Sequence, residues 1–211
     1  MPKIDQDRNL RTRYWNRLIP YNFEETSRDT FASNKLFHMT HRKIVMNLCT
    51  SLDGYIEGAE GEIDWCLTDQ DYGMTEFLSR IDTIFFGRKS YTQLLEAMPQ
   101  AFPDKKKVVF SNTLTTVPED VQIINSDVKE EVQKILNTSG GDIWLFGGAV
   151  LSTALLELDL VDEFIISIHP LVLGSGKPLF LPLNTRKNLE LHNSVTFSSG
   201  LLQVHYVLKR E

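Results

Sequence analysis

From Lys43 onward, short apolar runs alternate with segments of helical periodicity, and this alternation strongly limits the folds open to the chain. Strands that alternate with helices need crossover connections, and such connections produce a parallel sheet. We expect strands at 43–50, 82–89, 106–112, 121–125 and 142–146. We expect helices at 71–81, 90–98, 126–137 and 148–158, the third capped by Ser126 with Glu130 and Glu131 in its first turn.

The C-terminal part changes character, because three apolar strands at 163–173, 189–197 and 201–210 follow one another without a helix between them. Consecutive strands without crossovers indicate an antiparallel edge on the sheet. The predicted fold class is therefore α/β, a mixed and mostly parallel sheet flanked by helices, with antiparallel C-terminal strands. The pattern predicts one domain over 42–211.

Residues 1–41 show no sustained period of 2 or 3.6, so we interpret them as an N-terminal extension that is poorly ordered or packs outside the core. Two alternatives stay open. Met39 is a second candidate start of the chain, and Tyr14 and Trp15 are candidates for an arm that packs on a neighbouring subunit.

Composition narrows the classes of partner. The chain has 22 Lys and Arg against 28 Asp and Glu, and this net charge of -6 argues against a broad nucleic-acid-binding face. It shows no apolar run long enough to span a membrane and no secretory signal, so a cytoplasmic protein is expected. Cys49 and Cys66 are interpreted as buried thiols in a reducing compartment. No metal site is expected, because neither the cysteines nor the five histidines show ligand spacing.

Two glycines in "DIWLFGGAVL" mark the junction between an apolar strand and the next helix. A helix N-terminus presents unpaired N–H groups and a positive dipole end, and an anion reaches them only where no Cβ blocks the approach. Gly147 and Gly148, followed by Ala149, therefore suit a diphosphate. Close packing of helix on strand is an equally good explanation of a double glycine.

Two further strand ends carry similar chemistry. Gly87 ends one strand and is followed by Arg88, Lys89 and Ser90, which suit a phosphate or form a solvated helix start. Another strand ends in Ser111 and Asn112, which suit a ribose or phosphate or form a turn. Because ligands of parallel sheets bind beyond the carboxyl ends of strands, one extended cofactor with several phosphates would explain all three.

Four motifs in this order resemble the dihydrofolate-reductase-like superfamily, and most closely the reductase of riboflavin biosynthesis as a stand-alone member. They are "SLDGYI" at 51–56, "IDTIFFGRKSY" at 81–91, "LFGGAVL" at 145–151 and "LVDEFIISIHPLVLGSGKPLF" at 160–180. The resemblance implies NADPH as cofactor, a dihydrofolate-reductase-like fold and a homodimer. It also places 174–176 near the subunit contact or the mouth of the site.

By resemblance, the cofactor contacts are assigned residue by residue. Phosphates are expected at Gly87, Arg88, Lys89 and Ser90, the 2′-phosphate near Ser111 and Asn112, and the diphosphate at Gly147, Gly148 and Ala149. No acid stands beside Ser111 to repel a 2′-phosphate, which favours NADPH over NADH.

On the substrate side, the resemblance points to the first strand and the loop after it. Ser51 and Trp65 are expected to bind substrate, Trp65 by stacking on a flat heterocycle unless it packs in the core. Asp53 and Asp64 are expected to hold or relay the proton that must accompany hydride transfer, through a partly buried carboxyl with a raised pKa. An ordinary Asp-Gly turn is the alternative for Asp53.

Two departures leave the substrate open. The riboflavin-pathway motif D-D-P-x-L-T-x-R is replaced by "SYTQLLEAMPQAFPD", and the folate-type Met-Pro-Trp loop by "GEIDWCL". The expected function is an NADPH-dependent reductase of a small planar heterocycle, either a pterin or a pyrimidine like 5-amino-6-(5-phosphoribosylamino)uracil. The alternatives are a non-catalytic NADP-binding protein and a structural dimer with a vestigial pocket.

Overall fold

The computed structural model describes residues 41–210, so the expectations for the N-terminal extension lie outside the described residues apart from His41. Eight strands form one sheet in the order β5-β4-β3-β6-β1-β7-β10-β9. Their bounds are β1 (Ile44–Ser51), β3 (Ile81–Gly87), β4 (Lys106–Phe110), β5 (Val121–Ile124), β6 (Asp142–Gly147), β7 (Glu163–His169), β9 (Leu189–Thr196) and β10 (Leu202–Leu208).

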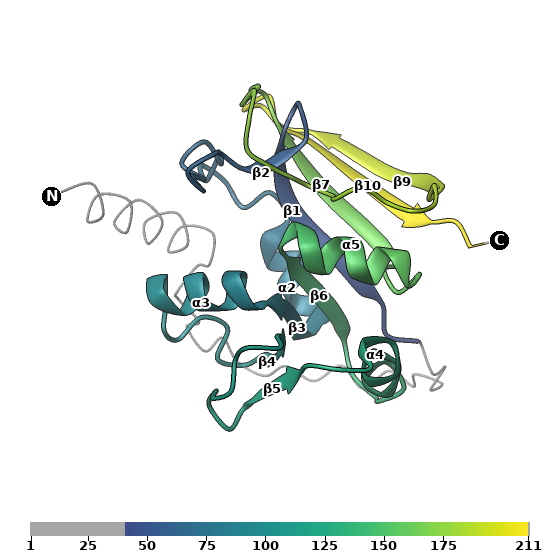
Figure 1. The fold of residues 1–211 in the computed structure, drawn as a ribbon. Helices are drawn as coiled ribbons and strands as arrows, with labels where there is room; N and C mark the ends of the chain where they lie inside the picture. The colour runs from purple at the N-terminus through teal and green to yellow at the C-terminus, as the bar shows by residue number, and fades with distance from the viewer. Residues whose placement is uncertain (1–40, 211) are drawn as a thin grey trace, which may run out of the picture.

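The sheet is mixed in the predicted way. The neighbouring pairs from β5 to β7 are all parallel, whereas β10 runs antiparallel to both β7 and β9 (Figure 1). The predicted fold class is confirmed. The order of the strands is new information, because β1 lies inside the sheet between β6 and β7 although it comes first in the described chain.

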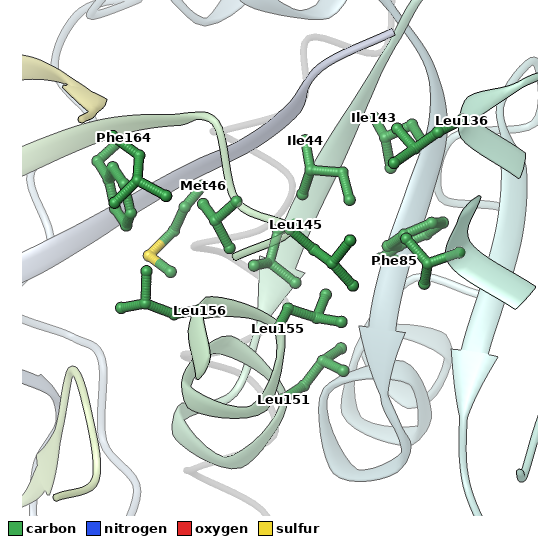
Figure 2. Close-up of a cluster of buried hydrophobic side chains, with 14 of the residues drawn as sticks. Ile44, Met46, Phe85, Leu136, Ile143, Leu145, Leu151, Leu155, Leu156 and Phe164 are labelled. Carbon is green, nitrogen blue, oxygen red and sulfur yellow. The ribbon is translucent and has the colours of Figure 1, made fainter. Parts of the chain in front are cut away.

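Within residues 41–210, four helices cover the two faces: α2 (Met74–Arg80), α3 (Arg88–Ala97), α4 (Val128–Leu136) and α5 (Ala149–Glu157). Leu151, Leu155 and Leu156 of α5 pack on Ile44 and Leu145 of the sheet, in the cluster that Figure 2 shows. The opposite face buries Phe77 of α2 and Leu94 of α3 against Ile84, Phe86 and Trp144. Figure 1 shows α5 in front of the sheet and α2 behind it.

The longest helix that the structure describes, α3, has ten residues. Spanning a bilayer takes about 20 mostly apolar residues, so no helix within 41–210 meets the length and hydrophobicity of a membrane span.

Two short strands were absent from the sequence-based prediction. β2 (Tyr55–Glu57) and β8 (Lys177–Pro178) pair antiparallel as a separate ribbon. Strands of two and three residues carry no readable period, so the sequence gives no signal for them.

Two element ends also differ from prediction. Ser126 is not the cap of α4, because the helix begins at Val128 and its N-cap is Asp127, at a left-handed φ of 48° and without a side-chain capping bond. The strand expected over 163–173 ends at His169, since Pro170 has no N–H to continue the ladder and Leu171 N instead donates to His169 O.

Charged side chains gather where the parallel strands begin. Glu163, 3% exposed, accepts hydrogen bonds from Lys43 Nζ at 2.6 Å and Arg80 at 2.8 Å, and His205 Nε2 lies 3.1 Å away. Burial alone would raise the pKa of Glu163, but the ion pairs with Lys43 and Arg80 outweigh it and lower that pKa to about 2. The amino-end edge of the sheet is therefore held together by ion pairs.

We expect Glu163→Gln to lower the free energy of unfolding at pH 7 by about 2 kcal/mol, because it leaves Lys43 and Arg80 without their buried counterion. The folded-state pKa lies below the unfolded value of 4.5, so this stabilisation is present above pH 4.5 and is lost as the pH falls toward 2. Urea unfolding at several pH values should therefore show a shallower acid loss for the variant than for the wild type.

The matched control is Glu190→Gln, whose side chain is 68% exposed and lies 3.6 Å from Lys209. An exposed pair of this kind contributes about 0–1 kcal/mol, so the control should unfold like the wild type. Identical acid sensitivity of the Glu163 variant and the wild type would contradict the assignment.

Candidate functional site

The three predicted junctions meet at one edge of the sheet. Phe86 pairs with Gly147 and Gly87 pairs with Phe110, so the carboxyl ends of β6, β3 and β4 lie side by side. Ser111 follows β4 directly, and its N–H donates to Ile124 O of β5 at 3.0 Å. One extended ligand can therefore reach all three junctions.

The double glycine is required by both backbone and space. Gly147 and Gly148 have φ values of 96° and 102°, which side chains with a Cβ rarely adopt. A Cβ on Gly147 would lie 3.2 Å from Ser152 Oγ, and one on Gly148 would lie 3.3 Å from Ser90 Oγ. The close-packing interpretation is therefore supported, whereas diphosphate binding at these glycines stays a prediction.

Helices α3 and α5 begin at this edge without side-chain caps. The N-cap residues Gly87 and Gly148 have no side chain that could cap the first-turn amides of their helices. Arg88 and Lys89 are exposed, and within 41–210 neither makes an ion pair. Two helix starts and two exposed cations thus lie at the same edge of the sheet, and such a combination can bind phosphate.

Ser90 connects the two junctions. Its Oγ donates to Gly147 O at 3.0 Å, and the residue also lines the pocket described below. While this bond holds, the hydroxyl can accept from a ligand but has no proton to give to a phosphate oxygen. The geometry therefore gives Ser90 a positioning role, whereas phosphate binding by its hydroxyl stays a prediction.

Ser111 closes a turn. Its buried Oγ accepts from Leu114 N at 2.9 Å and from Thr113 N at 3.2 Å. This is the turn interpretation that the sequence left open, and it leaves one hydroxyl proton to donate. Asn112 is exposed beside it and can face a ribose or phosphate.

Asp53 does not have the raised pKa expected of a proton donor. It is exposed, and the bond donated by Ser51 Oγ at 2.6 Å, joined by Gly174 N at 2.8 Å and Leu173 N at 3.1 Å, lowers its pKa. Asp53 does not line the pocket. Its carboxylate instead ties the turn after β1 to 173–174, so the Asp-Gly turn is the better supported interpretation and a catalytic role stays a prediction.

Asp64 and Trp65 both lie in the loop between β2 and α2. Like Asp53, they do not line the pocket. Asp64 is exposed. Trp65 is partly buried, donates from Nε1 to Glu62 O at 3.2 Å, and packs edge-on against His169 with ring centroids 5.3 Å apart. This contact matches the packing alternative, and substrate stacking by Trp65 stays a prediction.

A pocket opens between the glycine junctions and the loop from β2 to α2. Its cavity of about 160 Å³ is roughly ten times the space that one water molecule needs, so it can hold an organic ring. It reaches the junctions through Ser90 and Gly148, and its walls include the aromatic residues Tyr72, Phe102, Trp144 and Phe146. Its polar groups include Asn47, Cys49, Glu57, Cys66, Asp71, Ser167, His169 and Gln203.

The polar wall is partly organised. Gln203 Nε2 donates to Ser167 Oγ and to Tyr72 O, both at 3.1 Å, which fixes the amide in place. Among the described lining residues, Glu57 and Asp71 carry the carboxyl groups, and Glu57 is paired with Lys177 at 3.0 Å. Asp71 accepts from Thr75 N and Oγ1 and makes no ion pair within 41–210.

Sequence reasoning missed most of this pocket. A period of two on β1 puts Asn47 and Cys49 on one face, and the same period on β7 adds Ser167 and His169. Ser51 shares this face but does not line the pocket, so substrate binding by Ser51 stays a prediction. That alternation is a usable signal for β1 and β7. The loop residue Cys66 carries none, because the path of the loop over the sheet is a tertiary property.

We expect Asp53→Ala to loosen the segment that its carboxylate holds. Hydrogen–deuterium exchange at the amides of Leu173 and Gly174 should become faster, because both lose their acceptor. Asp64→Ala is the matched control, since it removes an exposed carboxylate from the same region and should leave those amides unchanged. Equal exchange in the two variants would contradict the role of Asp53.

This chain is similar to proteins of known sequence and structure. Residues 42–203 match the family described as the RibD C-terminal domain. The protein YyaP of Bacillus subtilis (strain 168), described as uncharacterized, is 46% identical over 181 residues, which cover 80% of this chain and 96% of YyaP.

Two solved structures share the fold. A putative riboflavin biosynthesis protein from Shewanella sp. PV-4 has a TM-score of 0.73 at 28% identity, covering 80% of this chain and 99% of its own. Dihydrofolate reductase from Enterococcus faecalis, complexed with NADP(H), has a TM-score of 0.59 at 16% identity, covering 80% and 97%. The dihydrofolate-reductase-like fold is confirmed, and family and neighbours together support an oxidoreductase in general. The chain belongs to the RibD C-terminal domain family.

Proposed function

We propose that this protein is an NADPH-dependent reductase of a small planar heterocycle. The observation that carries the proposal is the meeting of two uncapped helix starts, α3 and α5, at the mouth of a largely apolar pocket. The cradle at Gly147 and Gly148 fits a diphosphate, because a Cβ at either position would be strained and crowded. NADPH, when bound there, supplies the hydride.

The residues of the chain bind and orient the cofactor and the substrate, and they exclude water. The first-turn amides of α3 and α5 and the side chains of Arg88 and Lys89 neutralise the phosphates. The aromatic wall around Trp144 and Phe146 provides a dry surface for a flat ring. The amide of Asn47 can bind N–H and C=O groups at the rim of such a ring. Gln203 already donates both of its N–H groups, so it can only accept from a ring N–H.

Asp71 is the carboxylate that we propose to contact the substrate. It lines the pocket, in contrast to Asp53 and Asp64, and it makes no ion pair among the described residues. It can accept hydrogen bonds from heterocycle N–H groups and pass a proton from solvent. We prefer Asp71 to Asp53, the acid favoured from the sequence, because Asp71 lines the pocket and Asp53 does not.

The lining also bears on the class of substrate. Within the described residues, no Lys or Arg lines the pocket, so no cation there would neutralise the phosphate of a ribosyl substituent. We therefore propose an unphosphorylated heterocycle such as a pterin ahead of a phosphoribosylamino-pyrimidine. A non-catalytic NADP-binding protein of the same fold remains the second candidate, since the cradle by itself supports binding.

The expected homodimer also remains a proposal. Strand β9 is one edge of the sheet and is exposed along its whole length, with Leu191 at 53% exposure. Apolar side chains on an open sheet edge favour a second copy as the cover. A monomeric mass in analytical ultracentrifugation would contradict this.

We expect NADPH to raise the melting temperature more than NADH at equal concentration, because the cations and polar groups at the junctions favour a 2′-phosphate. Arg88→Ala should weaken NADPH binding about tenfold, the loss of roughly one charge-assisted contact. Arg186→Ala is the matched control. It removes an exposed arginine from the loop that contacts the C-terminal end of α5, the end away from the cradle. Equal NADPH affinity in the two variants, measured by calorimetry, would remove the Arg88 assignment.

The reductase itself is tested by NADPH oxidation with a panel of pterins, phosphoribosylamino-pyrimidines and simple carbonyls. We expect turnover with an unphosphorylated heterocycle and a loss of at least tenfold in kcat/KM for Asp71→Asn. Tight NADPH binding without turnover of any compound would favour the non-catalytic alternative.

A further inference from the structure

Three groups that bind soft metals come together on one wall of the pocket. Cys49 Sγ, Cys66 Sγ and a ring nitrogen of His169 all lie within 4.8 Å of one another. Cys49 pairs with Ser167, and Ser51 pairs with His169, so the parallel register of β1 and β7 places Cys49 and His169 on the same face. Cys66 arrives from the loop between β2 and α2, held by the turn in which its N–H donates to Ile63 O at 3.2 Å.

The imidazole of His169 is oriented as a ligand. It is fully buried, and its Nδ1 lies 3.1 Å from Ser167 O. A carbonyl oxygen only accepts, so Nδ1 carries the hydrogen of this bond and the lone pair of the neutral ring is at Nε2. Nε2 has no hydrogen-bond partner among the described residues. A histidine held through its other N–H by a backbone carbonyl is the usual outer-shell arrangement of a metal ligand.

An unpartnered buried acceptor destabilises the folded chain, and a bound cation would remove this cost. Zinc–sulfur bonds of about 2.3 Å in a tetrahedral centre put two sulfur ligands roughly 3.8 Å apart. The ligand atoms of the three residues lie within 4.8 Å of one another, so they would approach one another by roughly 1 Å to reach this geometry. Two thiolates also balance the charge of a divalent ion, so the loaded centre is neutral in its apolar surroundings.

We propose that Cys49, Cys66 and His169 form a Zn²⁺ site. Two thiolates and an imidazole form a soft ligand set, which favours Zn²⁺ over the oxygen-seeking Mg²⁺ and Ca²⁺. Three protein ligands leave a fourth position, and because all three residues line the pocket, this position faces it. Such an open site would hold water or a heteroatom of a pocket ligand.

The test uses the full-length protein, stripped of metal by a chelator and kept reduced. Competition of Zn²⁺ with a chromophoric chelator should give one ion per chain with a Kd below about 1 μM. Co²⁺ in its place should give a thiolate-to-cobalt charge-transfer band. Cys49→Ser, Cys66→Ser and His169→Gln should each weaken Zn²⁺ binding at least tenfold.

His192→Gln is the matched control, because His192 is an exposed histidine on β9 and its loss should change nothing. If a variant does not fold, the wild type is tested instead. In the wild type, Zn²⁺ should slow alkylation of Cys49 and Cys66. Absence of the cobalt band, or a Kd that the three substitutions leave unchanged, would overturn the proposal. No nucleotide is added, so the result is independent of the reductase proposal.

Discussion

The close approach of β3 and β6 at their carboxyl ends is the constraint on which the rest of the structure depends. A Cβ on Gly87 would lie 3.3 Å from Gly147 O, so the two strands meet there without room for side chains. The left-handed φ values of Gly147 and Gly148 then turn the chain into α5 at once. Because of this contact, two helix starts that are far apart in sequence share one opening.

The amino-end and carboxyl-end edges of the sheet differ in how their charged side chains are paired. At the amino-end edge, Glu163 is buried with Lys43 and Arg80, and their mutual pairing lowers its pKa to about 2. At the carboxyl-end edge, Arg88 and Lys89 are exposed beside uncapped amides. Charge is neutralised within the protein at the amino-end edge, whereas at the carboxyl-end edge it makes no ion pair among the described residues and suits the proposed phosphate ligand.

The pocket joins two kinds of chemistry in one cavity. Its mouth at Ser90 and Gly148 belongs to the proposed phosphate cradle, and its aromatic wall suits a flat ring. Cys49, Cys66 and His169 lie on another wall, where the buried Nε2 of His169 has no hydrogen-bond partner among the described residues. A reductase needs the phosphate cradle and the aromatic wall. The cluster of Cys49, Cys66 and His169 follows from neither of them.

The sequence by itself determined the element types, the change from parallel to antiparallel pairing, the strand-to-helix junctions at Gly87 and Gly147, and the strand end at Ser111. These rest on local periodicity, on glycine and on chain connectivity, all of which are readable along one dimension. It could not give the short strands β2 and β8 or the cap of α4, where the local signal is absent or misleading.

Only the tertiary structure decided which side chains line the pocket. Asp53, the favoured acid, is held outside the pocket by Ser51 and 173–174, whereas Asp71 lines it. Cys49, Cys66 and His169 have no ligand spacing in the sequence, and they meet because strand register and a loop path bring them together. Such proximity depends on the order of strands in the sheet, which local patterns do not encode.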